Sequence, residues 1–247
     1  MVDNSHNKEY NVSYNGVRSG LWKTWYDDDE QILESEGCYV NGELNGMWRE
    51  WYGDDDDEQV LESEGYYVNG KPHGVWRYWY NNDLHTLKSE QHYVNGKLDG
   101  VWRYWYDTQR EINDQQTTGS LRHTEGGLRH TLENERHYVD DKPHGVWRWW
   151  YYNDQNTEPK IASDEYISNK MLLDQTKDND QHTLRLEQHY IDGKLHGVWR
   201  QWYDNSQHTL KVEQHYVNGK LNGRQLEFDI DGNIIFDGEY IDGVKQQ

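Results

Sequence analysis

Carboxylate and imidazole side chains recur along this chain at a spacing that would suit metal binding. Glu90 lies two residues before His92. The same pair recurs as Glu135/His137, Glu187/His189 and Glu213/His215. Residues two apart in a strand share a face, and both groups can bind Zn²⁺. Duplication of one repeat accounts for the pattern, however, and no cysteine or compact ligand cluster accompanies it. We therefore predict solvated cross-strand pairing, with no metal site and no cofactor.

Two runs of carboxylates raise the question of calcium. They read "DDDE" at 27–30 and "GDDDDE" at 53–58. They lie one repeat apart, which in a sheet places them on the same edge, about 10 Å from each other. Flexible oxygen ligands suit Ca²⁺, but no Asp-x-Asp-x-Asp-Gly loop is present. The pattern favours acidic turns that solvate a sheet edge and block edge-to-edge pairing.

The residues give no sign of catalysis. The sequence has no G-x-S-x-G motif and no phosphate-binding glycine loop. Each histidine or carboxylate that could act belongs to a repeating series, whereas a catalytic residue normally breaks a repeat. Cys38 is the only cysteine and cannot form an internal disulfide. We predict a protein that is not an enzyme, without catalytic residues, in the reducing environment of a cytoplasm.

The composition limits the partners. Of 247 residues only 33% are hydrophobic, yet there are 13 Trp and 20 Tyr, so aromatic side chains must form the core. The net charge of −20 opposes binding to nucleic acid and to anionic headgroups. No long apolar run is present, so we predict no membrane insertion, and weak binding to anionic lipid at most.

The chain repeats a tryptophan-rich pattern about every 26 residues. Each copy follows the form Y-V-N-G-K-x-x-G-V-W-R-x-W-Y. The copies begin at Tyr14, Tyr39, Tyr67, Tyr93, Tyr138, Tyr190, Tyr216 and Tyr240. Asn-Gly or Asp-Gly within the pattern is a strong hairpin signal, and the flanking segments are rich in aromatic and β-branched residues typical of strands. We predict an all-β fold of tandem β-hairpins that form a single elongated, twisted antiparallel sheet.

This repeat pattern resembles the MORN repeat, in the variant form found in bacteria and large DNA viruses. The resemblance depends on Tyr93, Gly96, Gly100 and Trp102 and their equivalents in the other copies, and it covers nearly the whole chain. It implies one repeat domain over 1–247, with about seven to eight hairpins and long insertions near 107–134 and 152–187.

Each repeat carries two tryptophans that alternate between the faces of a strand. In "GVWRYWY" (74–80), Trp76 and Trp79 lie on opposite sides. The copy "GRQLEFDI" (223–230) has Leu226 and Phe228 on one face and polar residues on the other. Phe228 aligns with the second tryptophan, so we predict that the second column is the structural core. Its members are Trp25, Trp51, Trp79, Trp105, Trp150, Trp202 and Phe228.

The first tryptophan column then faces a groove or solvent, beside a position that varies between copies. We predict that these residues bind a partner: Trp22, Trp48, Trp76, Trp102, Trp147, Trp199, Tyr78, Tyr104 and Trp149. The alternative is a bulge at the mid-strand glycine, such as Gly74 or Gly100, that lets both columns pack inside.

The two insertions are the least repetitive segments and are predicted to set specificity, or else to be tolerated loop expansions. The leading functional prediction is a non-enzymatic scaffold that binds a protein partner or associates with itself. The resemblance adds an antitoxin-like protein that neutralises a basic toxin. It also adds a structural or virion-associated protein of a giant virus, located in the virion or the infected-cell cytoplasm. A glycan-binding aromatic platform is a further alternative.

Overall fold

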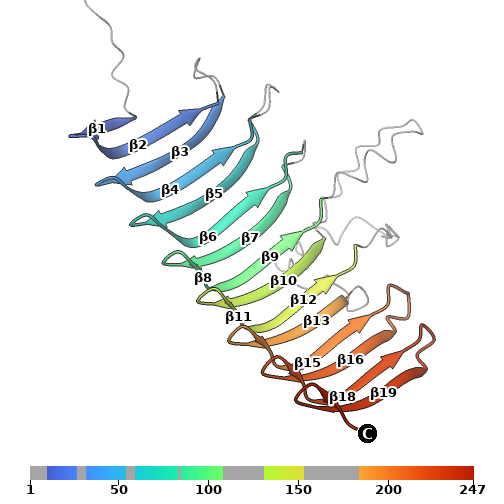
Figure 1. Ribbon diagram of the computed structural model, residues 1–247. Coiled ribbons are helices and arrows are strands. Elements are labelled where there is room, and N and C mark those ends of the chain that lie inside the picture. The colour runs from blue at the N-terminus through green and yellow to red at the C-terminus, as the bar shows by residue number, and fades with distance from the viewer. Residues whose placement is uncertain (1–9, 27–31, 54–58, 83–84, 108–130, 153–183) are drawn as a thin grey trace, which may run out of the picture. The chain divides into compact units, whose positions relative to one another are not determined.

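The predicted hairpin architecture is confirmed. The computed structural model describes residues 10–26, 32–53, 59–82, 85–107, 131–152 and 184–247. Within these residues there is no helix, and 20 strands form one open antiparallel sheet of consecutive hairpins (Figure 1). No helix in these ranges could cross a membrane.

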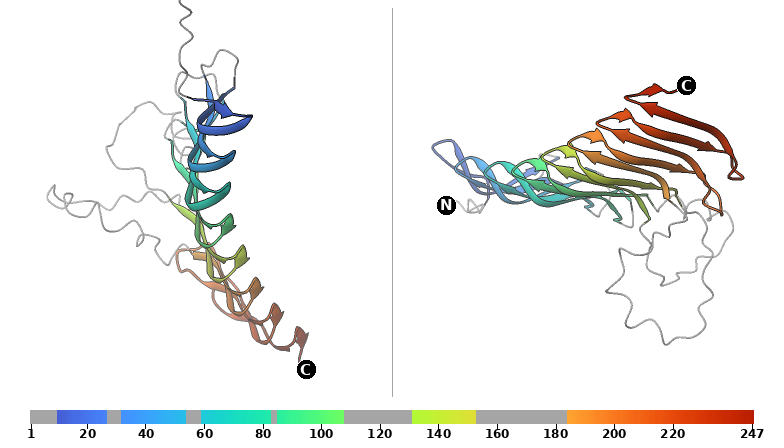
Figure 2. Two further views of the ribbon diagram at one scale, coloured as in Figure 1. Left: turned by 90° about the vertical axis from the view of Figure 1, so that its left-hand side faces the viewer. Right: turned by 90° about the horizontal axis from the view of Figure 1, so that it is seen from below.

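The sheet divides into two compact units. Of the described residues, unit 1 comprises those within 10–102, Asp107 and Tyr138–Asp141, and unit 2 comprises Arg103–Tyr106, Thr131–His137 and those within 142–247. The division crosses β9 (Gly100–Trp105) and β10 (Leu132–Val139). Within each unit the described strands lie in one layer and bend along their length (Figure 2).

The other strands have the following bounds. In unit 1 they are β1 (Val12–Tyr14), β2 (Val17–Trp25), β3 (Leu33–Val40), β4 (Glu43–Trp51), β5 (Leu61–Val68), β6 (Lys71–Trp79), β7 (Leu87–Val94) and β8 (Lys97–Leu98). In unit 2 they are β11 (Lys142–Pro143), β12 (Gly145–Trp150), β13 (Leu184–Ile191), β14 (Lys194–Leu195), β15 (Gly197–Trp202), β16 (Leu210–Val217), β17 (Lys220–Leu221), β18 (Gly223–Phe228), β19 (Ile234–Ile241) and β20 (Val244–Lys245).

The Asn-Gly pairs make two-residue hairpin turns, as predicted. Val68 pairs with Lys71 across Asn69 (φ 49°) and Gly70 (φ 72°), and two positive φ angles define the type I′ turn. One copy places Asp141 in the glycine position at φ 66°. Its carboxylate accepts a hydrogen bond from the Leu98 amide at 2.7 Å, which supports this less favourable conformation.

A β-bulge recurs near the opposite end of the hairpins. In β6 and β7, Tyr78 pairs with Ser89 and Trp79 pairs with Leu87, so Lys88 is the extra residue. The same register shift occurs at the equivalent place in the other repeats, which makes Glu34, Glu62, Arg185, Lys211 and Ile235 the extra residues. In three repeats the bulge places a cation beside the tyrosine that follows the second tryptophan: Lys88 lies near Tyr80, Arg185 near Tyr151 and Lys211 near Tyr203.

In five repeats that tyrosine joins its repeat to the next. The Tyr52 hydroxyl donates to the backbone oxygen of Trp79 at 2.8 Å, and in unit 2 the Tyr203 hydroxyl donates to that of Phe228 at 2.9 Å. Equivalent bonds are made by Tyr26, Tyr106 and Tyr151. At the turn edge, the Gly70 amide donates to the Leu44 oxygen at 2.8 Å. Neighbouring repeats are therefore linked at both ends of their strands.

Removing one tyrosine hydroxyl should weaken this link measurably. We expect Tyr203→Phe to lower the free energy of unfolding by about 0.5–1.5 kcal/mol, the usual net value of one hydrogen bond. Tyr240→Phe is the matched control, because the Tyr240 hydroxyl makes no hydrogen bond to another described residue. Urea unfolding followed by circular dichroism measures both changes. An equal effect of the two substitutions would contradict a structural role for the hydroxyl.

Candidate functional site

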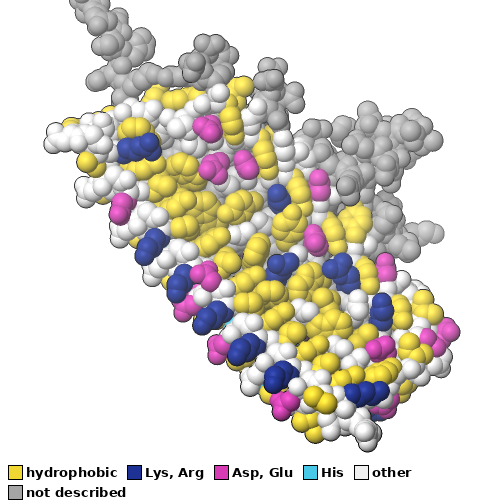
Figure 3. Space-filling model, viewed as in Figure 1, with side chains coloured by type: hydrophobic (Ala, Val, Ile, Leu, Met, Phe, Trp, Pro, Cys, Tyr) yellow, Lys and Arg dark blue, Asp and Glu magenta, His cyan; other side chains and the backbone are white. Residues whose placement is uncertain are grey.

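One face of the sheet, which we call the aromatic face, carries the first tryptophan of each repeat and the tyrosine that begins the repeat pattern. Tyr67 lies edge-on to Trp48 and Trp76, with ring centroids 6.2 and 5.0 Å apart. In unit 2, Trp147 and Tyr190 are 4.7 Å apart. Edge-to-face and tilted ring pairs are favourable arrangements. Figure 3 shows the face on which hydrophobic side chains form a broad band across the strands.

The prediction that the second tryptophan column is better buried is wrong. All 13 tryptophans are described and none is exposed. Trp76 and Trp147 of the first column are 5% and 9% exposed, and of the second column only Trp150, at 8%, is comparably buried. The remaining tryptophans, including Trp102, Trp105 and Trp202, are half-buried. Members of both columns therefore pack, and the first column does not stand free in solvent.

The prediction that the second column is better buried was based on the last complete copy of the repeat, at residues 223–230. There Gln225 replaces the first tryptophan, yet it is only 8% exposed, while Phe228 is half-buried. The Gln225 amide donates to the Glu227 carboxylate at 2.8 Å. In a single layer, side chains are buried by neighbours on the same face, so a hydrogen-bonded amide can fill this place as well as an apolar group.

The residue on which the ring of each first tryptophan packs was not identified from the sequence. A Cβ built on Gly65 would lie 2.1 Å from the Trp76 ring, so the indole rests directly on this glycine. In the next repeat the equivalent residue is Gln91, which accepts a hydrogen bond from the Tyr93 hydroxyl at 2.6 Å. The change from "SEG" to "SEQ" along the chain was the available signal.

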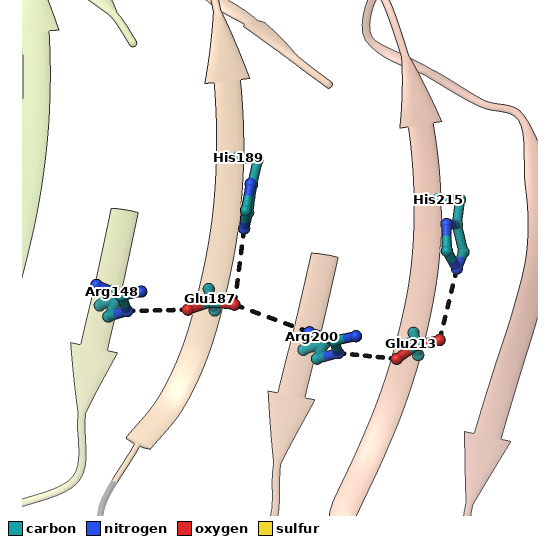
Figure 4. A network of polar contacts seen from close by, with 6 residues as sticks. All are labelled: Arg148, Glu187, His189, Arg200, Glu213 and His215. Carbon is teal, nitrogen blue, oxygen red and sulfur yellow. Dashed lines mark hydrogen bonds and ion pairs between the residues drawn. The ribbon is translucent and has the colours of Figure 1, made fainter. Parts of the chain in front are cut away.

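The opposite face, which we call the charged face, carries ion pairs between strands. In unit 1, Arg77 lies 3.7 Å from Glu64 and 3.1 Å from Glu90. In unit 2, Glu187 contacts Arg148 at 2.9 Å and Arg200 at 4.0 Å (Figure 4). Glu64, which also lies 3.5 Å from Arg49, and Glu187 thus each lie between arginines of two neighbouring strands.

The histidines join this network from the same strand as their glutamate. His189 and His215 lie 3.6 and 3.5 Å from Glu187 and Glu213 (Figure 4). The predicted cross-strand pairing is found, with arginine as the partner across strands. Within the described ranges no three His, Cys, Asp or Glu side chains are grouped to hold a metal ion. Burial raises the pKa of Glu213, but the hydrogen bonds and charges of Arg200 and His215 outweigh it, so this pKa is below its ordinary value.

Several sequence predictions fall on residues 27–31, 54–58, 108–130 and 153–183, which lie outside the described residues. These are most of the acidic turns and of the two insertions, whose roles as solvated edges and specificity segments stay predictions. No model of a known protein family matches this chain, and no curated protein is similar to it. The MORN resemblance likewise stays a prediction.

Proposed function

We propose that this chain is a non-enzymatic repeat scaffold that binds a protein partner through its aromatic face. The observation that supports this most is a single layer of strands whose tryptophans are mostly half-buried rather than enclosed. Part of each such ring stays accessible to a partner. Tyrosine and tryptophan are enriched at protein interfaces, where they contribute much of the binding energy.

The aromatic face also varies in the way that specific recognition requires. Two residues after the first tryptophan stand Tyr78 in unit 1 and Trp149 in unit 2. Their rings lie 6.3 Å from Trp76 and 5.9 Å from Trp147. Elsewhere the same position is Thr24, Glu50 or Gln201. The constant tryptophans supply contact area, and this column gives each repeat a different surface.

The charged face is a weaker candidate because its charges already compensate one another. Glu36 contacts Lys23 at 3.3 Å and Arg49 at 3.2 Å, and Glu64 contacts Arg49 and Arg77. A partner that bound there would have to replace these pairs, which offsets its own electrostatic gain.

A matched pair of tyrosine substitutions tests the proposal. The full chain is used as bait in extracts of its native cell, beside the variants Tyr78→Ala on the aromatic face and Tyr66→Ala on the charged face. Tyr66 is 46% exposed, and Met47 is its cross-strand neighbour. We expect Tyr78→Ala to lose a specific bound protein that wild type and Tyr66→Ala retain. Equal recovery with both folded variants contradicts binding through the aromatic face.

A further inference from the structure

A cleft on the aromatic face of unit 1 combines aromatic and acidic side chains. It has a volume of about 340 Å³, at the lower end of the size of small-ligand sites. We call it the acidic cleft. It is lined by Thr24, Tyr26, Glu34, Ser35, Trp48, Glu50 and Glu62, from β2 to β5.

The glutamates of the acidic cleft differ from those of the charged face. Each inner glutamate of the charged face pairs with at least one arginine, but no ion pair among the described residues involves Glu34, Glu50 or Glu62. Ser63 donates a hydrogen bond to Glu50 at 2.9 Å. Burial raises the pKa of Glu62, the nearby charge of Glu50 raises it further, and the charge of Lys88 lowers it in part. The cleft therefore holds negative charge that a cation would stabilise.

Other repeats place a cation at the corresponding position. Lys88, an extra residue of the β-bulge, lies over the Tyr80 ring at 5.7 Å. In unit 2, Arg185 lies 6.0 Å from the Tyr151 ring and Lys211 lies 5.3 Å from the Tyr203 ring. The bulge residues of the first repeats are Glu34 and Glu62. In the acidic cleft the chain thus supplies a carboxylate where three other repeats supply a cation.

The walls of the acidic cleft are fixed before any ligand arrives. The Tyr26 hydroxyl donates to the Trp51 backbone oxygen at 2.8 Å, and the Thr24 and Ser35 hydroxyls are 2.6 Å apart. Preorganised groups lose little entropy when they bind. Trp48 adds an indole, the ring that attracts cations best. Since the described carboxylates are not grouped to hold a metal ion, the arrangement suits a larger organic cation.

We propose that the acidic cleft binds a lysine or arginine side chain in a basic segment of the partner protein. The cation lies between the carboxylates of Glu50 and Glu62 and against the aromatic walls, as Lys88 and Lys211 lie against the tyrosine rings of their own repeats. This inference rests on the proposed function and specifies the chemistry of its partner. The charge of the cleft complements a basic segment, which the acidic net charge of the chain also attracts over a distance.

A hexalysine peptide and its fully acetylated counterpart test the proposal by calorimetric titration of the full chain. The variant Glu50→Gln/Glu62→Gln removes two carboxylates from the acidic cleft. The variant Glu43→Gln/Glu239→Gln removes two exposed carboxylates elsewhere and has the same net charge. We expect the cleft variant to bind hexalysine about tenfold more weakly than the control variant, the order expected for two partly exposed ion pairs. Acetylated peptide should not bind.

Equal affinities of the two folded variants for hexalysine would overturn the proposal, because attraction to the overall charge would then explain binding. Binding of the acetylated peptide at equal strength would overturn it too. Tyr66→Ala should leave hexalysine binding unchanged, since Tyr66 lies on the charged face and does not line the acidic cleft. If the cleft variant keeps the native partner that Tyr78→Ala loses, the cleft proposal fails while the scaffold proposal stands.

Discussion

Replacement of Trp76 by alanine is expected to lower the free energy of unfolding by about 3–5 kcal/mol, the range for removing a large buried aromatic side chain. Trp76 is the most buried tryptophan, at 5% exposure. Its ring contacts Tyr67 and Tyr93, and its indole nitrogen donates to the Tyr66 backbone oxygen at 3.3 Å. Alanine would remove these contacts together and leave a cavity between three strands.

Trp79→Ala is the control for this prediction, because Trp79 is in the same strand but is half-buried. Both variants are measured by urea unfolding, with circular dichroism and tryptophan fluorescence as independent probes. We expect Trp79→Ala to cost distinctly less. If the two losses were equal, the second tryptophan column would contribute as much to stability as the first, and burial of the single ring would not decide the effect.

Gly65→Ala should destabilise the protein by the opposite route, through excess volume. The added methyl group would lie 2.1 Å from Cδ2 and Cε2 of Trp76, so the indole would have to move. Inserting a methyl group into a packed site typically costs about 1–3 kcal/mol. The neighbouring Tyr66→Ala, on the other face and 46% exposed, should change stability by no more than about 0.5 kcal/mol.

A double-mutant cycle makes this prediction specific to the ring. In the Trp76→Ala background the indole is absent, so adding Gly65→Ala should cost almost nothing. The measured quantity is the difference in unfolding free energy between the single and double variants. A cost that persists without the indole would show that Gly65 is needed for its backbone conformation and not for its contact with Trp76.

The hairpin architecture could be predicted because its determinants are local. Asn69 and Gly70 adopt positive φ angles that few residue pairs accept, and their recurrence fixed where each chain reversal occurs. The alternation of aromatic and polar residues then placed Trp76 and Arg77 on opposite faces. Both inferences depend only on residues that are adjacent in the sequence. They could therefore be made without knowledge of how the side chains pack.

Burial and the links between repeats depend on residues distant in sequence and could not be predicted in this way. The Tyr203 hydroxyl reaches a backbone oxygen 25 residues later, and backbone acceptors leave no trace in the side-chain pattern. The acidic cleft likewise joins Glu34 of β3 to Glu62 of β5, across three strands. The presence of Glu in some repeats and Lys in others at the bulge position is visible in the sequence. That this residue lies at a bulge beside an aromatic ring follows only from the strand pairing in the structure.

The links between repeats have a consequence for how such a chain can change in length. The Tyr52 hydroxyl bonds to the following repeat, and the Gly70 amide bonds to the preceding one. A whole repeat could therefore be gained or lost, and the two new neighbours would find the same acceptors at the same places. Partial repeats would not, because they would leave a hydroxyl or an amide opposite the wrong residue. Variation in copy number by complete units is thus compatible with this fold, whereas variation by a few residues is confined to the loops.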